Sequence, residues 1–253
     1  MSQTDTRPIA IIAVALVACL AGGAWWMSRP KKTAQNATPA VVTATEAPID
    51  KPGPLPPVNL PPLDKMDGFL RPMLSALSSR PELARWLATD DLVRQLAMAI
   101  DQAATGASPA RDFKVLKPST PFVPAGRGLR RTIDPASYRR YDGLVQTVTS
   151  IDASSVAKIY KTIHPRLNEA YRSLGNQTSD VDRGLAQVLD ILVDTPVVKD
   201  PIAITVSDTG GGWAYVDDDL ETLKPAQKQL LRMGPANVDR LLVWLRALQT
   251  ALQ

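Results

Sequence analysis

Cysteine and histidine are almost missing from this chain, which has one of each in 253 residues, Cys19 and His164. One cysteine excludes an intramolecular disulfide, and the two residues together are too few for a zinc site of Cys and His ligands. Histidine-based catalysis would have to use His164. The sequence therefore contains no metal motif, and we expect no cofactor.

The part of the chain that should fold has no strong excess of charge of either sign. From residue 64 onward there are 24 basic and 22 acidic residues, a net charge of +2. An evenly basic nucleic-acid binder is not indicated by this balance, so nucleic acid is not an expected partner. Anion binding would need local clustering of basic residues.

Long apolar runs are limited to residues 9–27, which are 19 residues without a charge. As a helix this segment would span about 28 Å, close to the thickness of the hydrocarbon layer. Trp25 and Trp26 end the run where interfacial aromatic residues are expected. We predict a single transmembrane helix at 9–27, after a short tail at 1–8.

Two other interpretations of this segment remain open. A cleaved secretory signal peptide would have a shorter apolar core and a small-residue cleavage site. A lipoprotein signal would make Cys19 a lipidation site, because residues 16–18 resemble the box before a lipidated cysteine. Against lipidation, the apolar sequence continues from Leu20 to Met27.

The segment at 28–62 has the composition of an extended linker, with nine prolines in 35 residues. Such a spacer could reach on the order of 100 Å. The three cations that closely follow the apolar run, Arg29, Lys31 and Lys32, outnumber Arg7 before it. By the positive-inside rule this favours a cytoplasmic C-terminus, whereas the spacer favours a domain held away from the membrane within the envelope.

Residues 63–253 are predicted to form one mainly helical domain. Apolar stripes at helical spacing in residues 156–174 and 238–252 predict two long helices, the first kinked at Pro165. Two short β-hairpins are predicted, 122–123 against 129–133 and 202–206 against 213–216. Helix starts are indicated at Ser79-Pro81, Asp90, Asp134-Pro135, Asp152, Asp180 and Gly234-Pro235, and helix stops at Gly106 and Gly175.

Basic residues cluster between Arg111 and Tyr141, a segment that contains eight basic residues and only two acidic ones. Such a cluster could bind an anionic polymer, a lipid headgroup or an acidic partner. The candidate binding residues are Arg127, Arg130, Arg131, Arg139, Arg140, Tyr138 and Tyr141. The alternative is a solvated hairpin and helix edge, with both tyrosines packed in the core, because they share a helical stripe with Leu144, Val145 and Val148.

Other polar groups favour structural roles. His164 precedes Pro165 and is better explained as a histidine on a helix surface than as a catalytic base. Residues 217–219 are aspartates and Glu221 follows, but their spacing fits no EF-hand, so we expect a charged turn before a helix that starts at Pro225. No catalytic residue is assigned.

Three segments, in combination, resemble a known bacterial family. They are residues 81–87 (PELARWL) with Asp90-Asp91-Leu92, residues 133–138 (IDPASY) with Tyr141-Asp142, and residues 230–235 (LLRMGP). The sequence resembles the family known as domain of unknown function 3014, whose members also place a single span and a Pro-rich stretch before the domain. The resemblance implies this architecture and a bacterial source, and it implies no activity.

The resulting expectation is a single-pass protein of the bacterial inner membrane with a periplasmic C-terminal domain. Its function would be that of a non-enzymatic binding or scaffold module for a protein or an anionic envelope polymer. The alternative is an envelope hydrolase or transferase that acts through paired carboxylates, which need neither His nor Cys. A further alternative, a cytoplasmic anchor for nucleic acid, requires the opposite orientation. The oligomeric state is not indicated.

Overall fold

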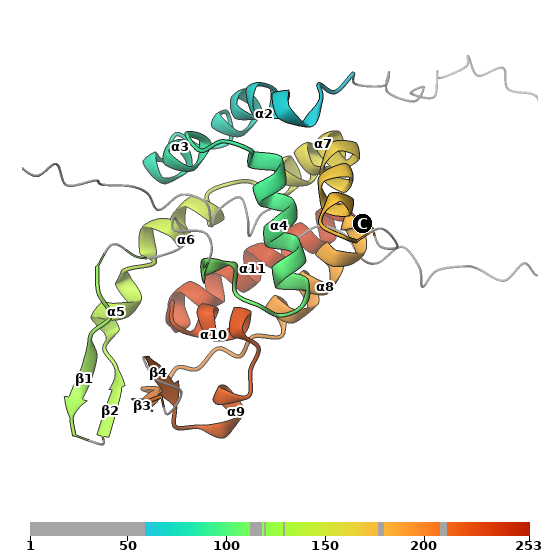
Figure 1. The fold of residues 1–253 in the computed structure, drawn as a ribbon. Coiled ribbons are helices and arrows are strands. Elements are labelled where there is room, and N and C mark those ends of the chain that lie inside the picture. Colours follow the sequence, from blue (N-terminus) through green and yellow to red (C-terminus); the bar gives the residue numbers. More distant parts are fainter. Residues whose placement is uncertain (1–58, 112–117, 119, 129, 177–179, 208–211) are drawn as a thin grey trace, which may run out of the picture.

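Four helices pack against one another in the computed structural model and make the centre of the domain (Figure 1). They are α4 (Leu92–Ala104), α7 (Ala153–Ser173), α8 (Val181–Val193) and α11 (Pro235–Leu252). Their apolar faces build the main core, because each helix carries leucine, isoleucine or valine at helical spacing. The two long helices predicted from the sequence are confirmed. Pro165 lies inside α7, which runs through it as one helix.

The structure describes residues 59–253 except 112–117, 119, 129, 177–179 and 208–211. The predicted anchor at 9–27, Cys19 and most of the linker lie outside these residues. Within the described part of the chain, no helix has the length and apolar character needed to cross a membrane.

Shorter helices surround the centre. At one end of the domain lie η1 (Leu63–Lys65), α2 (Met66–Ser75) and α3 (Pro81–Leu87). The other short helices are η2 (Pro109–Arg111), α5 (Pro135–Arg139), α6 (Asp142–Thr149), α9 (Asp218–Glu221) and α10 (Pro225–Leu231). The stripe from Tyr138 to Val148 is therefore two helices, since α5 ends at Arg139 and a turn precedes α6.

Most of the predicted helix caps are present. Asp134, Asp152 and Asp180 each accept a hydrogen bond from a backbone N–H in the first turn of α5, α7 and α8, at 2.7, 2.8 and 2.9 Å. The expected cap at Asp90 is wrong, because α4 begins one residue later, after Asp91. Asp91 has a left-handed backbone with φ of 59°, and its side chain does not cap the helix.

The predicted hairpin of 202–206 against 213–216 is confirmed. A hairpin also forms near 122–133, but its first strand lies at 124–127 and not at 122–123 as predicted. Together the two hairpins form one four-stranded antiparallel sheet in the order β1-β2-β3-β4. The strands are β1 (Pro124–Arg127), β2 (Arg130–Ile133), β3 (Ala203–Val206) and β4 (Trp213–Tyr215). The first strand begins two residues later than expected, because the chain turns tightly at Gly128, whose φ is +65°. The pairing of β2 with β3 joins hairpins that are far apart in the sequence.

The sheet lies at the opposite end of the domain from α2 and α3 (Figure 1). A second, smaller core joins the sheet to α9 and α10 and contains Ile133, Ile202, Ile204, Tyr215, Leu220 and Leu231. At the α2 end, the Arg166 guanidinium of α7 donates hydrogen bonds to the carbonyls of Pro61 and Leu60, at 2.8 and 3.2 Å. The described chain thus enters the domain far from the sheet.

Candidate functional site

A pocket of about 290 Å³ opens between the sheet and the helices α5, α6 and α10. None of the described residues that line it is acidic. Its lining residues are Phe122, Ile133, Arg140, Tyr141, Ile204, Gly212, Trp213, Tyr215, Gln229 and Arg232. The pocket therefore combines aromatic and apolar walls with two guanidinium groups, which favours an anionic ligand.

The sheet register places the apolar side of the pocket. Alternate residues of a strand point to the same face, and Ile204 pairs with Tyr215 and with Arg131, so these three side chains share one face. Ile133, two residues from Arg131, lies on this face as well. Across from the sheet, Gln229 and Arg232 are three residues apart at the end of α10 and therefore lie on one side of that helix.

Arg140 is held firmly in the wall of the pocket. Its Nε donates to the Ser137 carbonyl at 2.7 Å, and its Nη1 donates to the Thr120 carbonyl at 3.2 Å. The guanidinium carbon lies 5.4 Å from the centres of the Phe122 and Tyr141 rings. Two hydrogen bonds and two aromatic rings thus fix the plane of the Arg140 guanidinium. Its Nη2 has no hydrogen-bond partner among the described residues.

Arg232 has a half-buried side chain and forms no hydrogen bond or close ion pair with the described residues. Its charge favours the ionised form of the neighbouring Tyr215, but burial is the larger effect and raises the pKa of Tyr215 to about 12. Tyr215 therefore stays neutral at physiological pH and donates to the Lys228 carbonyl at 3.1 Å. The pKa of Glu221 is lowered mainly by its hydrogen bond with Lys228 and in part by the charge of Arg232, so this carboxylate balances some of the positive charge at the pocket.

Tyr141 and Gln229 add neutral polar groups to the pocket. The Tyr141 hydroxyl accepts a hydrogen bond from Gln229 Nε2 at 3.2 Å. That hydroxyl donates to none of the described residues, and the Gln229 amide oxygen likewise accepts from none of them. Both groups can therefore bind a ligand that donates and accepts hydrogen bonds.

Trp213 extends the site along the sheet. Its ring lies 6.0 Å from that of Phe122, centre to centre, with a tilt of 53°. The Arg131 guanidinium carbon lies 5.1 Å from the centre of the Trp213 ring. Beyond Trp213, the exposed Val206 is its partner in the strand register. The face that begins in the pocket thus continues over an aromatic ring toward a further arginine.

The seven binding residues suggested by the sequence fall into three groups. Arg140 and Tyr141 line the pocket, and Arg131 approaches it through Trp213. Arg127 is exposed at the end of the β1–β2 hairpin, where its register partner is Arg130. Arg139 is exposed on α5, and Tyr138 is partly buried against the smaller core.

Of the ten lining residues, sequence reasoning named only Arg140 and Tyr141 as binding residues and missed the other eight, which include Phe122, Trp213, Gln229 and Arg232. The only signal for any of these four was the resemblance at 230–235, which contains Arg232. Trp213 lines the same pocket as Arg140, and the pairing of β2 with β3 that brings the second hairpin there is a contact that local patterns do not show.

The single histidine lies in a different place, between α7 and α8. His164 Nε2 is 2.9 Å from Asp182 Oδ2, and the other Asp182 oxygen accepts from the buried Tyr160 hydroxyl. The hydrogen bond with Asp182 raises the pKa of His164, while its partial burial opposes the shift. The carboxylate has two partners already, so this group is a contact between helices.

The acidic residues do not assemble a catalytic pair in the described chain. Burial and the charge of Asp194 raise the pKa of Asp190, but both side chains lie on the exposed surface of α8 and outside the pocket. Asp217 caps α9 by accepting from the backbone N–H groups of Asp219 and Leu220. Glu221 pairs with Lys228 at 2.6 Å. No described group of three or more metal-ligating side chains could hold a metal ion.

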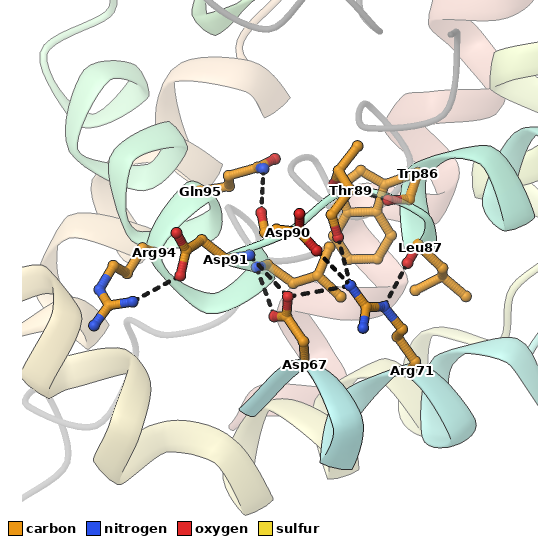
Figure 2. Close-up of polar contacts among 10 residues, drawn as sticks. Asp67, Arg71, Trp86, Leu87, Thr89, Asp90, Asp91, Arg94 and Gln95 are labelled. Carbon is orange, nitrogen blue, oxygen red and sulfur yellow. Dashed lines mark hydrogen bonds and ion pairs between the residues drawn. The ribbon is translucent and has the colours of Figure 1, made fainter. Parts of the chain in front are cut away.

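A dense polar cluster joins α2 to the start of α4 (Figure 2). The Asp67 carboxylate accepts from the backbone N–H groups of Asp91 and Leu92, at 2.8 and 2.9 Å, and thereby caps α4 from another helix. Arg71 donates to the carbonyls of Leu87 and Thr89, at 2.7 and 2.9 Å. Since these charged groups are paired with each other or with the backbone, the cluster holds the fold together.

The comparisons with known proteins identify a family but no function. The family model described as "Protein of unknown function (DUF3014)" matches residues 92–249, which include every described helix from α4 to α10, most of α11 and the whole sheet. No curated protein matches the chain. No solved structure matches it either.

Proposed function

The chain belongs to the DUF3014 family, and for this member we propose that the domain binds an anionic envelope polymer in the pocket between the sheet and α10. One observation carries the proposal: Arg232 is a half-buried guanidinium that forms no hydrogen bond or ion pair with a described residue, and no described residue that lines its pocket is acidic. Placing a charge out of water without a partner is unfavourable, so a bound anion would relieve this cost.

The shape of the site favours a polymer over a folded protein partner. A stable protein interface buries about 800 Å² of surface on each partner. Sites for small ligands are instead pockets, with volumes from about 300 Å³. The volume of about 290 Å³ matches the lower end of ligand pockets. Because the pocket face continues past Trp213 to Arg131, a chain-like ligand could place one unit in the pocket and further units along the sheet.

The anchor and linker complete the proposal. We propose that residues 9–27 span the inner membrane and that residues 28–62 hold the domain in the periplasm. The chain enters the domain beside α7, and the sheet lies at the other end (Figure 1). In this arrangement the pocket would face away from the membrane, toward polymers of the envelope.

The test measures binding of three soluble polyanions, polygalacturonate, polyphosphate and dextran sulfate, to the full-length chain in mild detergent. We expect Arg232→Gln to weaken binding of at least one of them about tenfold or more, the scale of a lost charged hydrogen bond. Arg240→Gln is the matched control. Arg240 is exposed on α11, and this substitution removes the same charge as Arg232→Gln.

Arg139→Gln separates the pocket from a diffuse basic surface, since Arg139 is exposed next to Arg140 but does not line the pocket. Equal losses with Arg139→Gln and Arg232→Gln would refute the pocket as the site. Binding of none of the three polyanions, with the variants folded, would refute the function.

A further inference from the structure

We infer that the ligand of this pocket is a carboxylated sugar, with its ring against Trp213 and Phe122 and its carboxylate on Arg232. This inference rests on the proposed function and narrows it to one chemical class. It depends on three features of the pocket: its aromatic walls, its neutral polar groups and the small number of its free charges.

The aromatic walls have more apolar surface than a bare phosphate or sulfate could use. Phe122 and Trp213 form a tilted pair with ring centres 6.0 Å apart, and Ile133 and Ile204 line the same pocket. A sugar ring has a flat face of C–H groups that can pack on the electron-rich face of an aromatic ring. A phosphate chain buries no comparable apolar surface, so these walls would add nothing to its binding.

The neutral polar groups match sugar hydroxyls. The Tyr141 hydroxyl has an uncommitted proton to donate, and the Gln229 amide oxygen is free to accept within the described residues. A hydroxyl both donates and accepts, whereas a carboxylate, a sulfate ester and a bridging phosphate of a polyphosphate chain only accept at neutral pH. The Gln229 oxygen would therefore stay unpaired with a purely anionic ligand and gain a partner with a sugar.

The charge of the pocket suits one carboxylate per bound unit. Arg140 already uses Nε and Nη1 on backbone carbonyls, so only Arg232 offers its full donor fork. A guanidinium can bind a planar carboxylate through two parallel hydrogen bonds. Since none of the described lining residues is a lysine, this part of the site has few of the charges that a polyphosphate segment would require.

An acidic peptide is the main competitor, because it also carries carboxylates. Its side chains would use Arg232, but glutamate and aspartate have neither a ring for Trp213 nor hydroxyls for Tyr141 and Gln229. The observations therefore favour the sugar, and a polyglutamate probe makes the peptide an outcome of the test.

The experiment compares four probes with the full-length chain in mild detergent: hexagalacturonate, maltohexaose, polyphosphate and polyglutamate. Maltohexaose has the rings and hydroxyls without carboxylates, and polyglutamate has carboxylates without rings. We expect hexagalacturonate to bind most tightly and to lose about tenfold or more with Arg232→Gln. Trp213→Leu should weaken it by several-fold, while Trp213→Phe, which keeps a ring, should retain most of the binding.

Each other outcome overturns a stated part of the argument. Polyphosphate or polyglutamate binding best, with loss on Arg232→Gln and no response to Trp213→Leu, would refute the sugar and leave the proposed function intact. Equal binding of maltohexaose and hexagalacturonate would refute the role of the carboxylate. If no anionic probe responds to Arg232→Gln, the proposed function fails and the sugar inference fails with it. Melting temperatures of the variants distinguish lost binding from lost folding.

Discussion

At the scale of the single residue, Asp67 illustrates how one carboxylate holds two helices in place (Figure 2). It accepts from two backbone N–H groups at the start of α4 and pairs with Arg71 at 3.2 Å. We predict that Asp67→Ala lowers the free energy of unfolding by about 2 kcal/mol, because the capped donors lose their partner. Urea unfolding followed by circular dichroism measures this loss.

The matched control is Asp64→Ala. Asp64 is exposed in η1 and makes no hydrogen bond or ion pair with the described residues, so its change should stay within about 0.5 kcal/mol. If the two variants are equally stable, Asp67 does not act as a cap.

His164 makes a second prediction at this scale, a pH dependence of stability. The hydrogen bond with Asp182 raises the pKa of His164, with a smaller contribution from the charges of Asp182 and Asp180. Burial alone would raise the pKa of Asp182, but hydrogen bonds from His164 and Tyr160 bring it below 3.8, so the carboxylate stays ionised near neutral pH.

A raised histidine pKa means that the folded state binds the proton more tightly than the unfolded state. The added stability is complete below the unfolded pKa of 6.5 and is lost as the pH rises through the higher folded pKa. We expect the urea midpoint to fall as the pH rises from about 6.5 through the higher folded pKa. His164→Gln should remove this slope, and a variant that keeps the full slope would show that another group causes it.

Residue roles were predicted well where they depend on neighbours in the sequence. The caps at Asp134, Asp152 and Asp180 follow from their place before apolar helical stripes, and the structure contains all three. Asp67 caps a helix that begins more than 20 residues further along the chain, and Arg232 shares its pocket with Arg140, which is also far away in the sequence. Such roles depend on tertiary packing and leave no mark in the local pattern.

At the scale of the element, each hairpin could be predicted from the local sequence, but the pairing of the two hairpins into one sheet could not. Each hairpin has a local signal, since alternating residues flank a turn that contains glycine. The pairing of Arg131 with Ile204 has none, because it joins strands separated by α5, α6, α7 and α8. This pairing carries Trp213 and Tyr215 to the pocket, so the site could be predicted only in part.

The junction of α10 and α11 gives the prediction at this scale. Gly234 has a φ of +83°, and a Cβ there would lie 2.5 Å from Tyr138 Cγ. We predict that Gly234→Ala lowers the free energy of unfolding by about 3 kcal/mol, through backbone strain and a clash with the Tyr138 ring. Gly128→Ala is the control for strain alone, since its φ is +65° and no atom lies within 4 Å.

The control should cost about 1 kcal/mol, so the difference between the two variants measures the contact with Tyr138. Denaturant unfolding of both proteins tests this difference. The double variant Gly234→Ala with Tyr138→Ala should recover part of the loss relative to the sum of the single changes. Equal losses of unfolding free energy for Gly234→Ala and Gly128→Ala would show that the Tyr138 ring moves aside at no cost in free energy.

At the scale of the whole molecule, composition and periodicity were enough to predict a mainly helical domain with short hairpins. They carried no information about which end of the domain holds the pocket. That arrangement follows from the contact of Arg166 with the Leu60 and Pro61 carbonyls at one end and from the sheet at the other. The proposed anchor would therefore be attached to the end of the domain that lies remote from the pocket.

This arrangement predicts unequal distances from a membrane. Deleting residues 33–57 would shorten the proposed linker by roughly 75 Å, at about 3.1 Å per extended residue. Dyes would be attached to Asp64→Cys at the entry end or to Arg127→Cys at the sheet end, each with Cys19→Ser, in vesicles that contain acceptor lipid. Both positions are exposed, so labelling should leave the fold intact.

We expect strong energy transfer from position 64 and weaker transfer from position 127 in the shortened chain, with little transfer from either in the full-length chain. Equal transfer from the two positions in the shortened chain would contradict a pocket that faces away from the bilayer, because the domain would then have no preferred end toward the lipid.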